Sequence, residues 1–255
     1  MTEKRLLFLT GRAFKAGKFD KAVLAVGSTE SHGDHLPHGT DTLVAEHLAD
    51  AVAERVEGLL VLPTIPVGMS EHYSSFPVAL SLSTETLKRV IDEILSSLLA
   101  HGITRLLIVN GHDGNLPAIE AATREFRVDH PQMCIAVLEA WWETAAELVP
   151  PGTLEVWGGL GHGGEGETSM MLALAPELVE MERARGVVPD LPAHVQIKWT
   201  FDELTPYAVT GDPTKATAEK GEKMWDALLD LLVSFIEGMD EEGWDLEAPR
   251  EGGSG

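Results

Sequence analysis

Residues 21–41 read KAVLAVGSTESHGDHLPHGTD. The first part, residues 21–27, is a short apolar run typical of a buried β-strand. The loop that follows, residues 27–41, contains three histidines and three acidic residues together with three glycines and a proline. Charged and imidazole groups at the end of a buried strand lose hydration, which is costly unless a metal ion or counter-charge satisfies them. The stretch therefore predicts a central strand with a metal site at its carboxyl end.

Apolar runs and helical patterns alternate on either side of this stretch. Further buried strands are predicted at residues 59–67, 105–110 and 133–139. Helical periodicity predicts helices at residues 42–56, 84–100 and 116–128. The second of these helices has a cap-like start at Ser83-Thr84-Glu85. Alternating strands and helices favour a three-layer α/β/α fold with a mainly parallel central sheet, and ligand chemistry then belongs at the carboxyl ends of the strands.

The C-terminal part predicts two more helices, over residues 167–174 and 215–237, with Gly238 as the stop of the second. We expect a single domain over residues 1–238. The segment 239–255 is acidic and ends in glycine and serine, which indicates a flexible tail.

Composition excludes several classes of protein. The chain has 255 residues, of which 44% are hydrophobic and 24% charged, as is ordinary for a globular protein. Its formal charge of -22 would repel nucleic acid and anionic membrane surfaces, so neither is an expected partner. The N-terminal apolar stretch is too short for a signal peptide or a membrane span, and Cys134 is the single cysteine. We expect a cytoplasmic protein.

Two further loops carry candidate ligands. Residues 110–115, Asn-Gly-His-Asp-Gly-Asn, place His112 at the carboxyl end of another predicted strand. Residues 161–169, GHGGEGETS, precede an apolar helix, and we expect His162 and one of Glu165 or Glu167 to face the same cleft. Each loop alone could be a structural turn or helix entry, but their joint placement favours a shared site.

Other patterns in these loops are weaker. The glycines at 159, 161 and 164 fit a dinucleotide-binding spacing, but no convincing strand precedes them. Glu167 stands where a phosphate-binding loop needs lysine. His32, His35 and His38 have helix-like spacing, but Gly33 and Pro37 argue against a helix, so the last two histidines are expected around the site rather than in it.

Taken together, the three segments resemble the creatininase family of amidohydrolases. Residues 27–41 follow G-S-x-E-x-H-G-x-H-L-P-x-G-T-D, with His38 where an apolar residue is more familiar. Residues 110–115 follow N-G-H-x-x-N, and residues 162–169 follow H-G/A-G-x-x-E-T-S. Weaker similarities lie at Glu71-His72, at Phe76-Pro77 and in residues 211–221. The resemblance spans most of the chain and implies a creatininase-like fold.

The resemblance also implies roles for individual residues. Glu30 and His112 would bind one metal ion, His32 would bind a second, and Asp41 would bridge the two. His162 corresponds to the family's proton-transferring histidine. A homo-oligomer, commonly a hexamer, is implied as well.

One position departs from the family pattern. In members that hydrolyse creatinine, a glutamate two residues after the histidine of the second motif completes the second metal site, but this chain has Gly114 there. Without this glutamate, Glu167 or a water molecule would have to take its place as a metal ligand. The missing glutamate also argues against creatinine as the substrate.

We therefore expect a hydrolase that uses one or two divalent metal ions per subunit to cleave a non-peptide amide, either a cyclic amide or a formamide. Oxygen and nitrogen ligands without sulfur fit zinc, manganese or ferrous iron. His162 or Glu167 would transfer the proton. Tryptophans that could wall a flat substrate are Trp141, Trp142 and Trp157, although core positions are equally compatible with them.

Three alternatives stay open at this stage. The first is a peptide-cleaving maturase of the same family, and the second is a non-catalytic protein that binds metal or a small molecule. The third is a serine hydrolase, for which no G-x-S-x-G motif is present.

Overall fold

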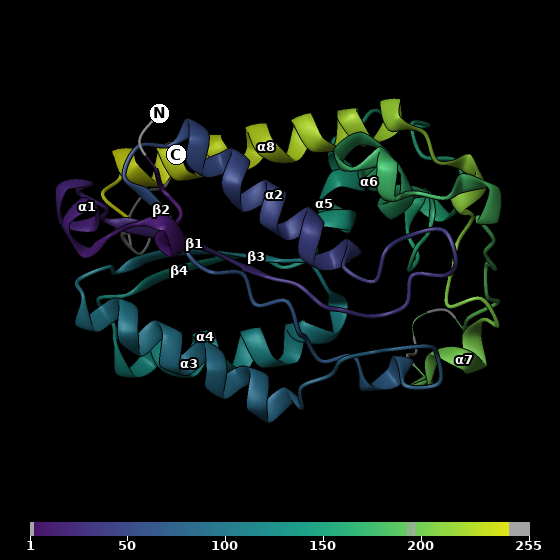
Figure 1. The fold of residues 1–255 in the computed structure, drawn as a ribbon, viewed down its shortest axis with the longest axis horizontal. Helices are drawn as coiled ribbons and strands as arrows, with labels where there is room; N and C mark the ends of the chain where they lie inside the picture. The colour runs from purple at the N-terminus through teal and green to yellow at the C-terminus, as the bar shows by residue number, and fades with distance from the viewer. Residues whose placement is uncertain (1–2, 193, 195–196, 245–255) are drawn as a thin grey trace, which may run out of the picture.

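The central sheet has four parallel strands in the order β2-β1-β3-β4 (Figure 1). The computed structural model describes residues 3–192, 194 and 197–244. Its strands are β1 (Lys21–Val26), β2 (Leu59–Val61), β3 (Arg105–Asn110) and β4 (Cys134–Leu138). All three pairings are parallel, which confirms the sheet predicted from the alternating apolar runs.

Helices cover both faces of this sheet. Figure 1 shows α2, α5, α6 and α8 on one side and α3 and α4 on the other, which confirms the three-layer α/β/α architecture. The helices are α1 (Gly11–Ala16), α2 (Thr40–Arg55), α3 (Thr84–Ala100), α4 (Leu116–Asp129), α5 (Trp141–Leu148), α6 (Glu165–Leu174), α7 (Phe201–Leu204) and α8 (Ala218–Glu241).

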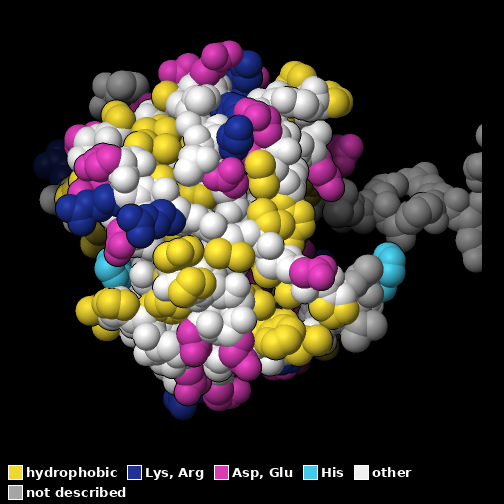
Figure 2. Space-filling model, turned by 90° about the vertical axis from the view of Figure 1, so that its right-hand side faces the viewer, with side chains coloured by type: hydrophobic (Ala, Val, Ile, Leu, Met, Phe, Trp, Pro, Cys, Tyr) yellow, Lys and Arg dark blue, Asp and Glu magenta, His cyan; other side chains and the backbone are white. Residues whose placement is uncertain are grey.

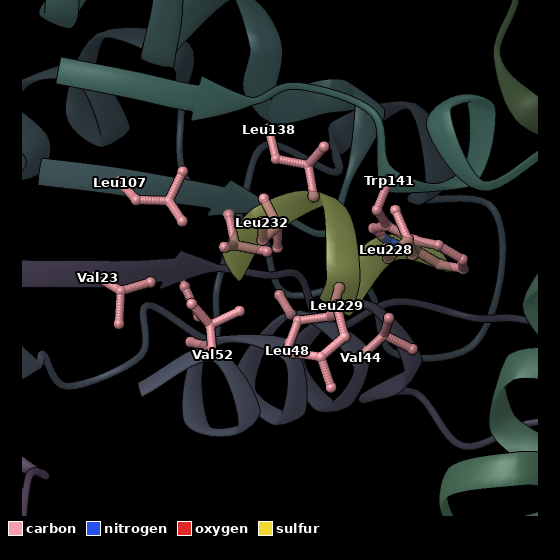
Figure 3. Packing of buried hydrophobic residues seen from close by; sticks show 14 of the residues in the cluster. Val23, Val44, Leu48, Val52, Leu107, Leu138, Trp141, Leu228, Leu229 and Leu232 are labelled. Carbon is pink, nitrogen blue, oxygen red and sulfur yellow. The ribbon is translucent and has the colours of Figure 1, made fainter. Parts of the chain in front are cut away.

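The two faces of β1 belong to two hydrophobic clusters. Val23 packs into a cluster with residues of α2 and α8, such as Leu48 and Leu228, and Figure 3 shows these side chains together. Its neighbour Leu24 points to the opposite face and packs with residues of α3. Because successive side chains of a strand alternate between faces, one buried apolar run supplies both layers of the core.

The start of α2 decides where one candidate ligand lies. The helix begins at Thr40, two residues before the predicted start at residue 42. Asp41 is therefore in the first turn of α2, where the N-terminal end of the helix dipole favours a carboxylate. The predicted cap of α3 is confirmed, because the Ser83 hydroxyl accepts a hydrogen bond from the backbone N–H of Thr86.

Two predicted element ends are wrong. The second strand ends at Val61 instead of residue 67, since Pro63 and Pro66 interrupt the supply of backbone N–H donors. The last helix does not stop at Gly238 but continues to Glu241. The glycine that takes the left-handed conformation is Gly243, with φ +67°, which directly follows the C-cap residue Glu242 and prevents the helix from continuing.

The predicted flexible tail is ordered over its first residues. Met239 and Trp244 are each 7% exposed and pack into the cluster beneath α8. Residues 245–255 lie outside the described residues. None of the helices in the described ranges combines the length and apolar character that crossing a bilayer requires.

The end of the molecule that carries α7 is also the end to which the strands point (Figure 1). Figure 2 looks directly at this end and shows apolar side chains gathered across its middle, with acidic side chains above and below them. The loops that leave the strands lie here.

Candidate metal centre

Three loops converge at the carboxyl ends of the strands. Residues 27–39 connect β1 to α2, residues 111–115 connect β3 to α4, and residues 160–164 precede α6. Val26 pairs with Asn110 in the sheet, so the first two loops leave neighbouring strands side by side. The histidines and acids predicted from the three motifs meet in this region.

The first group of candidate ligands is Glu30, Asp41 and His112. The Nδ1 atom of His112 lies 3.2 Å from Oε1 of Glu30 and 3.2 Å from Oδ2 of Asp41. All three side chains are buried, and their ligand atoms lie within 4.8 Å of one another. The spacing allows one ion to contact all three atoms.

The second group is His32, Asp41 and Glu167. The Nε2 atom of His32 lies 2.9 Å from Oδ1 of Asp41 and 3.6 Å from Oε2 of Glu167. These ligand atoms also lie within 4.8 Å of one another. Asp41 thus belongs to both groups and offers one carboxylate oxygen to each, which is the arrangement of a bridging carboxylate between two cations.

Each histidine of the site donates one ring N–H to a backbone carbonyl. The pairs are His32 Nδ1 with Glu30 O at 3.2 Å, His112 Nε2 with Met69 O at 3.0 Å, and His162 Nε2 with Ser31 O at 2.7 Å. A carbonyl only accepts, so the donating nitrogen carries the proton and the opposite nitrogen is left as a lone pair when the ring is neutral. In all three cases that second nitrogen faces the carboxylates, as is usual for histidines that bind metal ions.

Burial disfavours charge throughout the cluster, yet the neighbouring carboxylates hold His32 and His112, the histidines of the two candidate ligand groups, in their protonated form. Burial lowers the pKa of His32, but Asp41 and Glu167 outweigh it and raise the pKa to about 10. Burial likewise opposes the charge of His112, and Glu30 and Asp41 raise its pKa to about 9. Burial works against the ionised form of Asp41 too, but the two imidazoles hold its pKa well below the usual range. In the metal-free protein, protons therefore occupy the space between the ligand atoms.

Two buried oxygens show that the site fits a cation. Oε1 of Glu30 and Oδ2 of Asp41 have no hydrogen-bond partner with suitable geometry among the described residues. Buried carboxylate oxygens almost always have a partner, and leaving one without a partner is costly. A divalent cation between them would satisfy both, and the oxygen and nitrogen donors suit zinc, manganese or ferrous iron.

Of the two glutamates in the third motif, only Glu167 faces the cleft. Its Oε2 accepts a hydrogen bond from the backbone N–H of Gly163 at 2.6 Å, and burial raises its pKa to about 7. Glu165 is fully buried in another direction, where its carboxylate accepts hydrogen bonds from the Glu155 backbone and the Lys220 ammonium. The loop pattern alone left the choice between them open, whereas the family resemblance indicated Glu167.

Gly114 leaves no room for the glutamate that the resemblance to creatinine-hydrolysing family members would place there. A Cβ atom at this position would lie 2.2 Å from the carbonyl oxygen of Met69 and 2.4 Å from Nε2 of His112. Any side chain would therefore disturb the hydrogen bond that orients His112. Glu167, which reaches the cluster from the first turn of α6, belongs to the second ligand group without such a conflict.

His162 is held in place through its backbone. Its N–H donates to the Thr210 hydroxyl, and its carbonyl accepts from the Thr210 N–H. Gly161, with φ +109°, allows this close approach, because a Cβ there would lie 2.4 Å from the Thr210 carbonyl. Nδ1 of His162 lies 3.7 Å from Glu30 Oε1. Burial and the neighbouring His32 lower the pKa of His162 well below its ordinary value, so the ring is neutral at neutral pH.

The remaining histidines of the first loop lie around the cluster, outside its ligand groups. His35 is buried and its Nε2 donates to the Thr168 hydroxyl, which in turn donates to the carbonyl of Gly163. His38 donates to the carbonyl of Pro77 and so ties the first loop to residues 70–81. The contacts of His35 and His38 agree with the prediction that these two histidines lie around the site and not among its candidate metal ligands.

The tryptophans divide between core and cleft. Trp141 is fully buried in the hydrophobic cluster, and Trp157 is 42% exposed outside the cleft lining. Trp142 lines the cleft, a cavity of about 200 Å³. Its other lining residues are Asp41, Tyr73, Gly111, His112, Asp113, Gly161, His162, Glu167, Phe201 and Thr210.

Several residues of the site were not identified from the sequence. The Ser28 hydroxyl donates to Glu30 Oε2 at 2.9 Å and also contacts the hydroxyl of Ser70. Tyr73 follows Ser70 on a short 3-10 turn, Glu71–Tyr73, and Thr210 holds His162. The weak Glu71-His72 similarity was the one signal near Ser70 and Tyr73, but it did not indicate which neighbours enter the cleft.

The family profile described as "Creatininase: Creatinine amidohydrolase" matches residues 9–236. The chain is 33% identical over 227 residues to the mycofactocin precursor peptide peptidase of Mycobacterium ulcerans (strain Agy99), covering 84% of this chain and 83% of that protein. It is 35% identical over 230 residues to creatinine amidohydrolase of Pseudomonas putida, covering 84% and 87% respectively.

Solved structures show the same similarity. A creatininase in a manganese form aligns with a TM-score of 0.77 and 28% sequence identity, covering 94% of this chain and 98% of that one. A zinc–zinc form of a creatininase mutant aligns with a TM-score of 0.76 and 28% identity, covering 95% and 99%.

Proposed function

The chain belongs to the creatininase family, and on that premise we propose that it is a metal-dependent hydrolase that cleaves the carbon–nitrogen bond of a small non-peptide amide. The observation that carries the proposal is the shared position of Asp41, which presents one oxygen to Glu30 and His112 and the other to His32 and Glu167. Amide hydrolysis requires an activated water and a polarised carbonyl, and a site for two cations answers both needs.

In this proposal Glu30, Asp41 and His112 hold one divalent cation, and His32, Asp41 and Glu167 hold a second. A bound cation would acidify water and polarise the substrate carbonyl. The relatives with manganese and zinc forms support these two metals as first candidates, and ferrous iron fits the same donors.

His162 is the proposed proton carrier. Its ring is neutral, and Nε2 is fixed as a donor to Ser31, so Nδ1 is free to accept a proton from the attacking water. The same nitrogen can then return the proton to the departing amine. Glu167, the other candidate, already accepts from Gly163 and faces His32, which favours a ligand role.

The size of the cleft favours a small substrate. Its volume of about 200 Å³ is below the roughly 300–1,000 Å³ of pockets for drug-sized ligands. Such a space suits a cyclic amide or a formamide. A second candidate substrate is the end of a peptide, which the 33% identity to a peptidase favours.

A substrate panel tests the proposal. The protein is stripped with a chelator, reloaded with zinc, manganese or ferrous iron, and assayed against formamides, cyclic amides and short peptides. We expect hydrolysis of a non-peptide amide by the reloaded protein only. Turnover of peptides alone would favour the second candidate, and turnover without metal would refute the metal-dependent account.

Asp41→Ala is the matching variant. Because Asp41 belongs to both ligand groups, its loss should weaken binding at both sites and lower kcat/KM by about 10³-fold or more, a range typical for central catalytic groups. Wild-type metal content and turnover in this variant would remove the proposed bridge. The implied homo-oligomer stays a prediction, which a mass measurement in solution checks.

A further inference from the structure

The phenol hydroxyl of Tyr73 is a polar group without a hydrogen-bond partner among the described residues, carried by a side chain that is nearly buried. Tyr73 is 5% exposed, and its hydroxyl makes no hydrogen bond with any residue in the described part of the chain. The hydroxyl oxygen is not among the buried unpaired atoms of the site, so it is accessible from the cleft that Tyr73 lines. Because Tyr73 lines the cleft, a molecule that enters the cleft can supply the missing acceptor.

The backbone around Tyr73 is held firmly. Its N–H donates to the carbonyl of Ser70 at 3.0 Å, and its own carbonyl accepts from Phe76 at 2.9 Å. Ser70 in turn contacts Ser28, whose hydroxyl binds Glu30. The phenol is therefore positioned by the same framework that positions the first ligand group.

The ring of Tyr73 contacts the proposed proton carrier and another aromatic residue of the cleft lining. Its centroid is 4.5 Å from that of His162, 4.4 Å from that of Phe201 and 6.1 Å from that of His112. Trp142 also lines the cleft and carries an N–H donor, but Trp141 is its only ring contact among the described residues. Of these two donors, Tyr73 is the one next to the proposed proton carrier.

The charge of the cleft makes a neutral donor useful. Asp41, Asp113 and Glu167 all line it, and negative charge that develops on a substrate oxygen would be repelled by them. A phenol is protonated at neutral pH and offers one O–H donor without adding charge. Donors aimed at an oxygen that becomes an anion contribute more in the transition state than in the ground state.

We propose that the Tyr73 hydroxyl donates a hydrogen bond to the carbonyl oxygen of the scissile amide, and so stabilises the charge that develops there. This inference rests on the proposed amide hydrolysis. It adds Tyr73 to the groups that touch the substrate, beside the metal ligands and His162.

The chain offers a matched pair of variants, because its sequence contains two tyrosines. Tyr73→Phe removes the hydroxyl that lines the cleft, and Tyr207→Phe removes one from a side chain that is 43% exposed. We expect Tyr73→Phe to lower kcat/KM by about 10²-fold, the scale seen when one oxyanion donor is lost, while bound metal stays at the wild-type level. Tyr207→Phe should stay within about twofold of wild type. Equal activity of both variants and wild type would overturn the proposal.

A second readout does not depend on turnover. Protein labelled with ¹³C at the tyrosine ring carbon that bears the hydroxyl gives two signals, and Tyr73→Phe identifies one of them. We expect 2-pyrrolidone, a small cyclic amide, to shift the Tyr73 signal of the metal-loaded protein and to leave the Tyr207 signal in place. Saturating 2-pyrrolidone with no shift at Tyr73 would overturn the contact.

The two readouts separate this inference from the proposed function. Hydrolysis that Tyr73→Phe leaves unchanged would refute the role of Tyr73 and leave the hydrolase proposal intact. Absence of hydrolysis across the whole panel would refute the hydrolase proposal, and the ¹³C signal would still decide whether Tyr73 contacts an amide carbonyl.

Discussion

Gly114 lies so close to His112 that a Cβ atom on the glycine would fall 2.4 Å from Nε2 of the imidazole. The same Cβ would fall 2.2 Å from the Met69 carbonyl to which that nitrogen donates. The hydrogen bond that aims Nδ1 of His112 at Glu30 and Asp41 therefore depends on the absence of a side chain at position 114. It follows that the first ligand group and the family glutamate at this position are incompatible in the backbone conformation of this chain.

Gly114→Ala should weaken metal binding. The added methyl group must displace His112 or the Met69 carbonyl, so we expect the affinity for metal to fall at least about tenfold, with a loss of about 1–3 kcal/mol in the free energy of unfolding. Isothermal titration with zinc and urea denaturation measure the two effects.

The matched control is Gly238→Ala, since a Cβ there meets nothing within 4 Å and the position lies inside α8. That change should stabilise the protein by about 0.5–1 kcal/mol. Wild-type zinc affinity in Gly114→Ala would contradict the close contact.

His162→Ala separates proton transfer from metal binding. If His162 carries the proton, kcat should fall by about 10²- to 10⁴-fold while the bound metal stays at the wild-type stoichiometry. Metal analysis and steady-state kinetics on the same preparation give both values. His162 also lies near Glu30 and His32, so loss of metal together with activity would instead identify it as a ligand.

Metal binding should release protons. In the metal-free protein the pKa of His32 is about 10 and that of His112 about 9, each raised against burial by the neighbouring carboxylates. Both rings are therefore protonated at pH 7.5 and must become neutral to bind a cation. Since the metal-free state binds more protons, metal affinity should rise as pH rises from 6.5 to 8.5. Titrations in buffers of different ionisation enthalpy should show proton release, and a pH-independent affinity with none released would contradict the electrostatics.

The raised pKa values of His32 and His112 also make the stability of the metal-free protein depend on pH. A histidine whose folded pKa is raised contributes stability that is full below its unfolded pKa, about 6.5, and is lost as pH rises through the folded pKa. For His32 and His112 that loss falls between pH 7 and about 10. Saturating zinc should remove this dependence, because the bound ion replaces the protons.

The backbone conformation at Val78 predicts that a substitution there will stabilise the protein. It has φ +51°, a left-handed conformation that is strained for a β-branched residue, and it is 65% exposed. Val78→Gly should raise the free energy of unfolding by about 1 kcal/mol, measured by urea denaturation. The control Val188→Gly changes another exposed valine, which is not in the left-handed region, and should give a small loss. Equal effects of the two changes would show that φ at Val78 is not a source of strain.

The layers of the fold follow from local sequence patterns, whereas the exact ends of its helices and strands and the order of the strands in the sheet do not. Runs such as residues 105–110 are apolar throughout because both faces of each strand are covered, so the pattern alone predicts a parallel sheet between helices. Whether α8 stops before Gly238 or continues to Glu241 depends on the burial of Met239 and Trp244 by distant residues. The strand order β2-β1-β3-β4 likewise comes from pairings between distant segments.

The candidate site likewise contains some residues that the sequence identifies and others that only the folded chain brings together. Glu30, His32 and Asp41 lie in one motif that the sequence displays directly. The residue that holds His162 is Thr210, 48 positions further along the chain, and no spacing rule connects the two. Tyr73 reaches the cleft through a short turn whose contacts with His162 exist only in the folded chain. The candidate ligands could thus be predicted, while the residues that hold them and the proposed substrate donor required the structure.

The most direct test of the central claim is anomalous diffraction from crystals of the protein grown with zinc. The account predicts one anomalous peak between Glu30 Oε1, Asp41 Oδ2 and His112 Nδ1, and a second between His32 Nε2, Asp41 Oδ1 and Glu167 Oε2. A folded protein at saturating zinc with no anomalous density in contact with Asp41 would contradict it.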